Sequence, residues 1–190
     1  MTLNKTYRKL IETAKRARRK AYCPYSRYAI GSAVLTESGQ IFSGANVENA
    51  SYGLSLCGER VAIFNAISRG AKWLKAICVV GRSARPCGAC RQVMLEFSSK
   101  ETDLICVDLK TETGRDSITV TKMFKSLPHS FDPLDAGLLP TNPQNLLKRS
   151  KARSQEKQKR RSARKARSAA PRRKKRRTVG KKRAARKRGR

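Results

Sequence analysis

The sequence predicts an α/β protein of three layers (α-β-α), in which a mixed five-stranded sheet carries helices on both faces. Apolar residues recur at helical spacing over residues 4–21. Short apolar or alternating segments at 28–36, 40–42, 74–80, 103–109 and 118–120 indicate strands. Helical segments alternate with these strands in the order α-β-β-α-β-α-β-β-α, which is typical of one sheet covered by helices.

The first half of this pattern begins with an amphipathic helix and continues with two strands. Leu10, Ile11 and Ala14 share one side of the helix, with Lys and Arg residues between them. The helix is expected to end before Pro24, because proline cannot continue it. Residues 37–39, Glu-Ser-Gly, form a turn signal between the strands 28–36 and 40–42.

The second half alternates helix and strand. A helix is expected from Cys57 to a stop at Gly70, and another from Cys87 through Phe97. A short helix over 121–127 is expected to follow the last strand, with Thr121 as its N-cap.

Charge divides the 190 residues into a body and a tail. Residues 1–140 contain 21 basic and 12 acidic residues, whereas 141–190 contain 24 basic residues and only one acidic residue. From residue 148 onward the chain is almost entirely Lys, Arg, Ala, Ser and Gln, too polar to form a core, so disorder is predicted. We therefore expect a catalytic domain at 1–135, a linker at 136–147 and a disordered tail at 148–190.

Composition also excludes some protein classes and favours others. No apolar run is long enough to span a bilayer, and residues 1–10 contain no secretory signal, so a cytoplasmic protein is expected. Thiols stay reduced in that compartment, which favours metal binding over disulfides for the six cysteines. The tail indicates a polyanionic partner such as nucleic acid.

Two cysteine segments carry the chemistry. Cys57 is followed closely by Glu59 and Arg60, and Cys87 and Cys90 stand three residues apart. Three thiolates leave one position open on a tetrahedral zinc, and a separate carboxylate supplies proton transfer. Both segments lie where a predicted helix begins, and the positive end of a helix favours thiolates. Arg60 is expected to offset the negative charge by hydrogen-bonding the sulfurs.

The Cys-x-x-Cys pair has two alternative interpretations, a structural zinc site and a redox pair. The carboxylate two residues after Cys57 favours a catalytic zinc, because a structural site does not need it. His129 is the only histidine, so a histidine-rich site is excluded. Cys78 and Cys106 lie in predicted strands and are expected in the core. The set indicates hydrolytic deamination of a nucleobase, at C4 of cytosine or C6 of adenine.

Several segments together resemble the small, homotetrameric, three-cysteine cytidine deaminases. The similarity covers about residues 5–131 and includes 21–26 (Ala-Tyr-Cys-Pro-Tyr-Ser), 44–53 (Gly-Ala-Asn-Val-Glu-Asn-Ala-Ser-Tyr-Gly), both cysteine segments with Arg91-Gln92, and 127–131 (Leu-Pro-His-Ser-Phe). The resemblance implies that cytidine and 2'-deoxycytidine are hydrolysed to uridine and 2'-deoxyuridine in pyrimidine salvage, with one Zn2+ per subunit.

The resemblance also implies residue roles. Cys57, Cys87 and Cys90 would bind zinc, Glu59 would move protons, and Asn46 and Glu48 would hold the ribose. The remaining substrate contacts would come from Tyr28, Ala50, Tyr52 and Phe131. Phe131 would reach the site of a neighbouring subunit in a homotetramer. Two positions depart from the family pattern: Gly58 stands where Ala is usual, and Tyr28 where Phe is usual.

The tail has no counterpart in this family pattern. Its residues Lys174, Lys175, Arg176 and Arg177 form a patch typical of nuclear targeting, so nuclear or nucleoid association is a second expectation. It contains no aromatic residue, so its binding to nucleic acid or another polyanion is expected to ignore sequence. Three hypotheses follow: a nucleoside deaminase with a targeting tail, a polynucleotide cytosine deaminase whose tail anchors the substrate strand, and an inactive nucleic-acid-binding protein.

Overall fold

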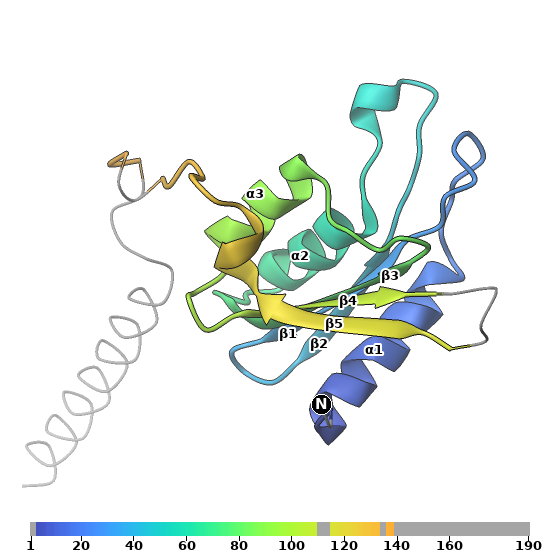
Figure 1. Cartoon of the computed structure of the whole chain (residues 1–190). Coiled ribbons are helices and arrows are strands. Elements are labelled where there is room, and N and C mark those ends of the chain that lie inside the picture. The colour runs from blue at the N-terminus through green and yellow to red at the C-terminus, as the bar shows by residue number, and fades with distance from the viewer. Residues whose placement is uncertain (1–2, 110–114, 134–135, 139–190) are drawn as a thin grey trace, which may run out of the picture. The chain divides into compact units, whose positions relative to one another are not determined.

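A five-stranded mixed sheet organises the chain (Figure 1). The computed structural model describes residues 3–109, 115–133 and 136–138. The strands are β1 (Gly31–Thr36), β2 (Ile41–Ala45), β3 (Leu74–Gly81), β4 (Asp103–Asp108) and β5 (Ser117–Lys122), in the order β2-β1-β3-β4-β5. Only β3 and β4 pair in parallel, and the other neighbours are antiparallel. Of the predicted linker only residues 136–138 are described, and the predicted tail lies outside the described residues.

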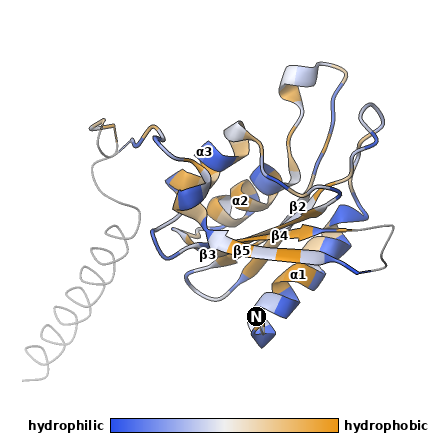
Figure 2. Cartoon of the chain, in the orientation of Figure 1, coloured by the Kyte–Doolittle hydropathy of each residue, from blue (hydrophilic) through white to orange (hydrophobic). Residues whose placement is uncertain are grey.

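Helices cover both faces of the sheet, which confirms the predicted three layers (Figure 1). On one face lies α1 (Lys5–Arg18), whose Leu10, Ile11 and Ala14 pack against side chains of β1, β3 and β4. On the other lie α2 (Gly58–Ser68) and α3 (Gly88–Glu96), which enclose a second core with Ile77 and Leu104. Colouring by hydropathy shows the apolar strands between these layers (Figure 2).

Two glycines allow the helices to approach the sheet closely. A Cβ atom on Gly31 of β1 would lie 2.2 Å from the carbonyl oxygen of Ala14 in α1. A Cβ atom on Gly44 of β2 would lie 2.4 Å from the backbone nitrogen of Ala62 in α2. Both distances are far below van der Waals contact, so any side chain there would push a helix away from the sheet.

Helix α1 begins as its sequence predicts but ends earlier. The side chain of Asn4 accepts a hydrogen bond from the backbone N–H of Tyr7 at 2.8 Å, which caps the helix. The helix ends at Arg18 rather than at residue 21, because the chain then turns to pair Tyr22 with the 46–48 segment. The first strand likewise begins at Gly31 rather than at Tyr28.

The region after β4 corrects one prediction. Thr121 does not cap a helix, because it lies inside β5, which extends to Lys122. The helix that follows is the short 3-10 helix η2 (Met123–Ser126), which has no side-chain cap. Pairing with β4 satisfies the backbone of residues 117–122 and keeps the chain extended past Thr121.

Candidate active site

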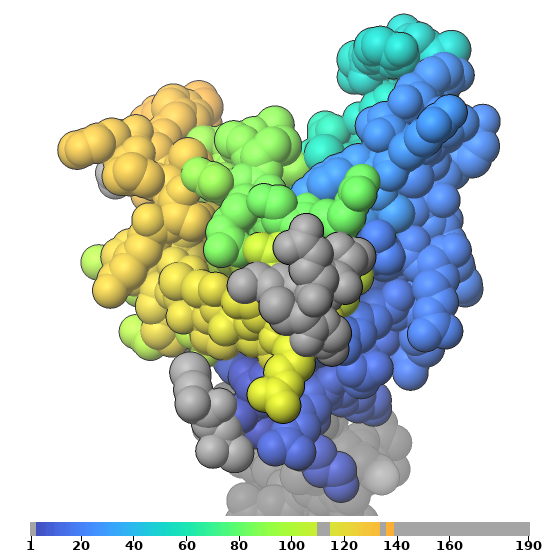
Figure 3. Space-filling view, turned by 45° about the vertical axis from the view of Figure 1, so that its right-hand side comes forward, coloured from blue at the N-terminus to red at the C-terminus, as the bar shows by residue number. Residues whose placement is uncertain are grey.

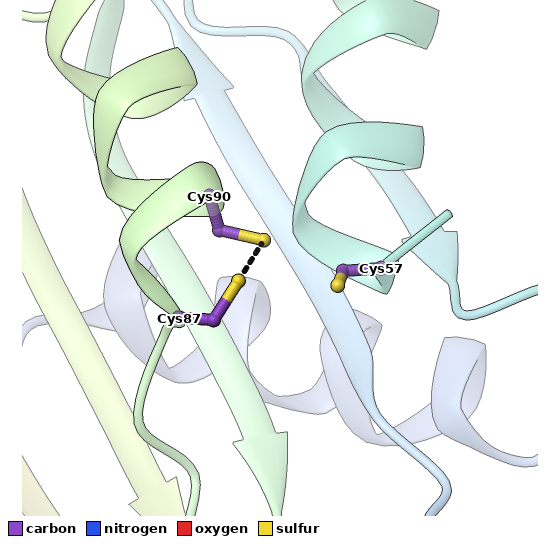
Figure 4. A group of neighbouring side chains, drawn as sticks. All are labelled: Cys57, Cys87 and Cys90. Atoms are coloured by element: carbon purple, nitrogen blue, oxygen red, sulfur yellow. Dashed lines mark hydrogen bonds between the residues drawn. The ribbon is translucent and has the colours of Figure 1, made fainter. Parts of the chain in front are cut away.

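Three cysteine sulfurs meet where two neighbouring helices begin. Cys57 directly precedes α2, Cys87 directly precedes α3, and Cys90 is the third residue of α3. Figure 4 shows the three side chains pointing toward one another from these helix ends. The sulfurs all lie within 4.8 Å of one another, and those of Cys87 and Cys90 are 3.5 Å apart. The sequence-predicted cluster therefore forms.

Cys57 and Cys87 stand at helix starts without capping the helices with their side chains. Cys57 and Cys87 are N-cap residues with extended backbone, and their carbonyls accept the first helical hydrogen bonds, from Val61 and Arg91. Neither side chain caps its helix, unlike the usual Ser, Thr or Asp at this position. The positive ends of two helices thus converge on three sulfurs that contact one another.

The donor set fits a zinc ion. Tetrahedral geometry with Zn–S bonds of about 2.3 Å places sulfurs about 3.8 Å apart, close to the observed cluster. Within the described part of the chain, no fourth His, Cys, Asp or Glu joins the group. A zinc held here would keep one position open, as catalytic zinc sites do.

Charges around the cluster favour a thiolate. The Cys90 thiol, the largest influence, and the Arg60 guanidinium both stabilise the Cys57 thiolate and lower its pKa to about 5. The same contact with Cys57, together with burial, raises the pKa of Cys90. Arg60 is held in place by a hydrogen bond of 2.9 Å from its Nη2 to the carbonyl of Ser55. Arg60 thus stands beside the sulfurs, as expected from the sequence.

Glu59 is a buried carboxyl beside these sulfurs. It is the second residue of α2 and only 4% of its surface is exposed. Burial raises its pKa to about 7, and the nearby charge of Cys57 acts in the same direction. Its Oε2 has no hydrogen-bond partner among the described residues. A buried acceptor without a partner, next to a metal-type donor set, suits proton exchange with a bound molecule.

A cavity of about 410 Å³ opens onto the cysteines and Glu59. Its lining brings together the sequence-predicted residues Tyr28, Asn46, Glu48, Cys57, Glu59 and Cys87. Sequence reasoning missed Ser26, Ser55 and Arg85, which also line it. Arg85 had a local signal, since it lies two residues before Cys87. Ser55 likewise lies two residues before Cys57, and Ser26 lies two residues before Tyr28, but only the fold shows that these side chains reach the cavity.

Asn46 and Glu48 have fixed orientations at the cavity. The Oδ1 atom of Asn46 accepts from the N–H of Ile30 at 2.8 Å, and its Nδ2 donates to the carbonyl of Tyr28 at 2.9 Å. The Glu48 carboxylate accepts from the N–H groups of Tyr25 (2.9 Å) and Ser26 (3.2 Å) and from the Ser26 hydroxyl. These hydrogen bonds lower the pKa of Glu48, and the bond from the Ser26 hydroxyl has the largest effect. Both side chains therefore also hold the 25–30 segment beside the cavity.

Tyr28 places its ring at the cavity and its hydroxyl on the backbone. The hydroxyl donates to the carbonyl groups of Arg82 and Ser83, the latter at 3.0 Å. Burial raises the pKa of this phenol. The extra oxygen relative to the Phe of the family pattern is thus satisfied by the segment that leads to Cys87.

Three predicted substrate residues lie outside this cavity within one chain. Ala50 is exposed, and Tyr52 is 73% exposed and packs edge-on against Tyr25, with ring centroids 5.6 Å apart. Phe131 is 58% exposed, although its carbonyl is held by the side-chain amide of Gln92 at 3.0 Å. Figure 3 shows the segments around residues 25 and 52 side by side in a projection at the upper right. The predicted patch from Lys174 to Arg177 lies outside the described residues.

Comparison with known proteins supplies the family. Residues 4–106 match the model of the cytidine and deoxycytidylate deaminase zinc-binding region, which is more than half of the chain. The chain belongs to this deaminase family. It is therefore an enzyme of the cytidine deaminase kind, a zinc-dependent hydrolase with one Zn2+ per subunit.

Individual deaminases match over the same extent. The cytidine deaminase of Sporosarcina psychrophila is 41% identical over 130 residues, which are 67% of this chain and 92% of the relative. That of Halalkalibacterium halodurans is 44% identical over 129 residues, 66% of this chain and 94% of the relative. The crystal structure of the Burkholderia pseudomallei cytidine deaminase superposes with a TM-score of 0.61 at 42% identity, covering 69% of this chain and all of that one. About a third of this deaminase chain lies outside these matches.

The helices of the described part are all too short or too polar to cross a membrane.

Proposed function

We propose that the chain deaminates cytidine and 2'-deoxycytidine hydrolytically, yielding uridine and 2'-deoxyuridine for pyrimidine salvage. The observation that carries this proposal is one cavity lined by Cys57, Cys87 and buried Glu59 together with Asn46 and Glu48. The first three offer metal and proton chemistry, and the last two offer an amide and a carboxylate that suit a sugar diol. The relatives named above are cytidine deaminases, which supports the same substrates.

In this proposal Cys57, Cys87 and Cys90 hold the zinc, which when bound lowers the pKa of a water and readies it to attack C4 of cytosine. Glu59 would accept the two protons of that water in turn, passing the first to the ring nitrogen and the second to the amine, which departs as ammonia. A carboxyl with a pKa of about 7 suits both directions of transfer near neutral pH. Its burial excludes bulk water, so the proton stays within the site.

The remaining cavity residues bind and orient the nucleoside. Asn46 and Glu48 both hydrogen-bond the 25–30 segment. One amide hydrogen of Asn46 and some of the lone pairs of Glu48 remain available to bind substrate. Because these bonds fix both groups before substrate arrives, little side-chain entropy is lost on gripping a ribose. Tyr28 offers the face of its ring to the base, since its hydroxyl is engaged with the backbone.

Residues outside the cavity fit a shared site. Ala50, Tyr52 and Phe131 have exposed surface that a neighbouring subunit would cover in a homotetramer. We propose that Phe131 enters the cavity of a neighbour, whereas Ala50 and Tyr52 close the rim. Val47 and Leu54, on the same loop as Ala50 and Tyr52, and Tyr22, which pairs with that loop, also have exposed side chains that are consistent with burial between subunits.

The deciding test compares substrates. The full chain and a form ending at residue 140 would be assayed on cytidine, 2'-deoxycytidine and single-stranded DNA and RNA. We expect both forms to turn over the nucleosides. Activity on strands alone, lost with the tail, would replace this proposal with a polynucleotide deaminase.

The role of Glu59 has its own test. Glu59→Gln is expected to retain zinc while turnover falls by about 10²- to 10⁴-fold, the usual contribution of a general acid–base. Glu96→Gln, an exposed change at the end of α3, is the matched control and is expected to leave turnover intact. Normal turnover of Glu59→Gln would remove Glu59 from this role.

We further propose that the basic tail binds nucleic acid without sequence preference and that the enzyme is cytoplasmic with nuclear or nucleoid association. The support is composition, since 24 of the residues 141–190 are basic and none is aromatic. Replacing Lys174, Lys175, Arg176 and Arg177 with Ala in a fluorescent fusion is expected to shift it toward the cytoplasm. An unchanged distribution would contradict targeting by this patch.

A further inference from the structure

Helix α1 carries a row of cations on its solvent side. The α1 basic face consists of six exposed residues, of which the last two directly follow the helix: Lys5, Arg8, Lys9, Arg16, Arg19 and Lys20. At 3.6 residues per turn the four helical members fall within an arc of about 100°, opposite the buried Leu10 and Ala14, and Glu12 lies in the same arc. These four follow the helix for about 17 Å, at 1.5 Å per residue, and Arg19 and Lys20 continue the row past its end.

This charge is not neutralised within the described structure. The single acidic residue of α1, Glu12, lies 3.4 Å from Lys15, which also contacts Asp116 at 2.8 Å. Lys15 is not part of the α1 basic face. None of the ion pairs among described residues includes a member of the face. A row of free cations of one sign raises the local concentration of anionic partners.

A groove at the end of α1 gives this face a shaped site. It has a volume of about 400 Å³ and lies between the last turns of α1 and the edge strand β2. Arg16 and Lys20 line it together with the hydroxyl-bearing Thr13 and Ser43, and no carboxylate lines it. The Thr13 hydroxyl donates to the carbonyl of Lys9 and accepts from Arg16, so Ser43 supplies the hydroxyl donor of the groove. Two cations beside a hydroxyl donor suit a phosphate group.

We propose that the α1 basic face binds the phosphate backbone of nucleic acid, independently of the tail. The cations form two groups, Lys5 to Lys9 before Glu12 and Arg16 to Lys20 after it, roughly 10 Å apart at 1.5 Å per residue. Two separated groups of cations match a ligand with several anions better than a single small anion. The face contains no aromatic residue for base stacking, so its binding is independent of sequence. A membrane surface fits less well, because the apolar side of α1 is packed on the sheet and cannot enter lipid.

The location of the face separates binding from catalysis. Helix α1 covers one face of the sheet, and the cysteines lie at α2 and α3 on the other (Figure 1). A strand bound along α1 therefore leaves the cavity open to free nucleosides. The inference concerns the folded body, and so it goes beyond both the deaminase activity and the tail proposed above.

The test removes four cations from the full chain. The α1 variant changes four residues to Gln, which keeps helix propensity: Lys5, Lys9, Arg16 and Lys20. The control variant changes four exposed cations that follow α2 or α3 or lie in η2, also to Gln: Arg69, Lys72, Lys100 and Lys125. Both variants lose the same net charge, and circular dichroism verifies their helicity.

Salt dependence of binding to a random-sequence duplex is the readout. Each phosphate contact contributes about 0.9 to the log–log slope, so loss of four contacts is expected to make the slope of the α1 variant shallower by about 3.6. The control variant is expected to change the slope by less than 1, and both are expected to deaminate cytidine normally. Equal slopes for the two variants would overturn the proposal, because binding would then depend on net charge alone.

Chemical footprinting of the full chain gives a second readout. Bound duplex is expected to shield Lys5, Lys9 and Lys20 from acetylation but not Lys72 and Lys100. Protection of the α1 lysines by vesicles of phosphatidylserine, without protection by nucleic acid, would assign the face to membranes and refute the inference. Inhibition of cytidine turnover by saturating duplex would contradict the placement on the face opposite the cavity.

Discussion

At the scale of single residues, the cysteine cluster and Glu59 have opposite electrostatic needs. The sulfurs require positive surroundings, which Arg60 and the starts of α2 and α3 provide. Glu59 requires burial, which keeps its proton affinity near neutrality. Both environments occur within three residues, because Cys57 is the N-cap of α2 and Glu59 is a buried residue of its first turn.

Glu59 gives a measurable pH dependence of stability once zinc is removed with a chelator. Its pKa is about 7 in the fold against 4.5 in an unfolded chain, so the folded state retains a proton that the unfolded state has lost. This contribution to the free energy of unfolding is complete below pH 4.5 and is lost as the pH rises through 7. Its size is about 3 kcal/mol, at 1.36 kcal/mol for each unit of difference between the two pKa values. Urea unfolding measured from pH 4.5 to 7 should show a loss of unfolding free energy in the unchanged protein that Glu59→Gln lacks. The same pH dependence in both proteins would contradict this role of Glu59.

The cysteines differ in what their replacement should do. Cys90→Ser removes one of three clustered sulfurs, so zinc content is expected to fall below one per subunit and turnover to be lost. Cys23→Ser is the matched control, because Cys23 is a free thiol outside the cluster. This variant should retain both its zinc and its turnover. Metal analysis of the purified variants measures this, and full zinc in Cys90→Ser would exclude Cys90 as a ligand.

At the scale of elements, the closeness of α2 to the sheet positions the site. Gly44 lets the first turns of α2 rest on β2, so Cys57 and Glu59 are held at the depth of the cavity. Asn46 and Glu48 extend from the same strand and hold the segment that carries Tyr28. One strand and the loop after it therefore set both ends of the cavity.

Gly44→Ala tests this arrangement. The new Cβ would lie 2.4 Å from a backbone atom of α2, so the helix must shift, and destabilisation of about 1–3 kcal/mol or more is expected. Zinc affinity should fall as well, because α2 carries Cys57. Gly53→Ala is the control, because nothing lies within 4 Å of the new Cβ. It should change neither stability nor zinc affinity. Thermal unfolding and zinc titration read out both effects, and wild-type behaviour of Gly44→Ala would refute the close approach.

At the scale of the whole molecule, a site shared between subunits predicts complementation. Under the proposed shared site, Glu59→Gln would leave a subunit without its proton carrier, and Phe131→Ala would leave the neighbour's cavity open. In mixed tetramers, a cavity with intact Glu59 can receive intact Phe131 from the other variant. Mixing two impaired proteins after dissociation is therefore expected to restore part of the turnover. Activity equal to the average of the separate variants would indicate sites confined to one subunit.

The sequence predicted most elements because each local signal agreed with the fold. Asn4 caps α1, the apolar side of α1 meets the sheet, and the strand segments fall in the sheet as expected. The error at Thr121 arose because a threonine suits both a helix cap and a strand. Pairing with β4, a long-range interaction, decided for the strand.

The sequence by itself determined the chemistry of this deaminase, because three thiols, one carboxyl and their spacing at two helix starts are local properties. It also determined the division into a moderately basic body and a highly basic tail. Only the tertiary structure decided which groups face one another. It brought Ser26, Ser55 and Arg85 to the cavity, left Ala50, Tyr52 and Phe131 outside it, and set the α1 basic face on the other side of the sheet. The physical reason is that these placements depend on strand order and helix packing, which join segments far apart along the chain.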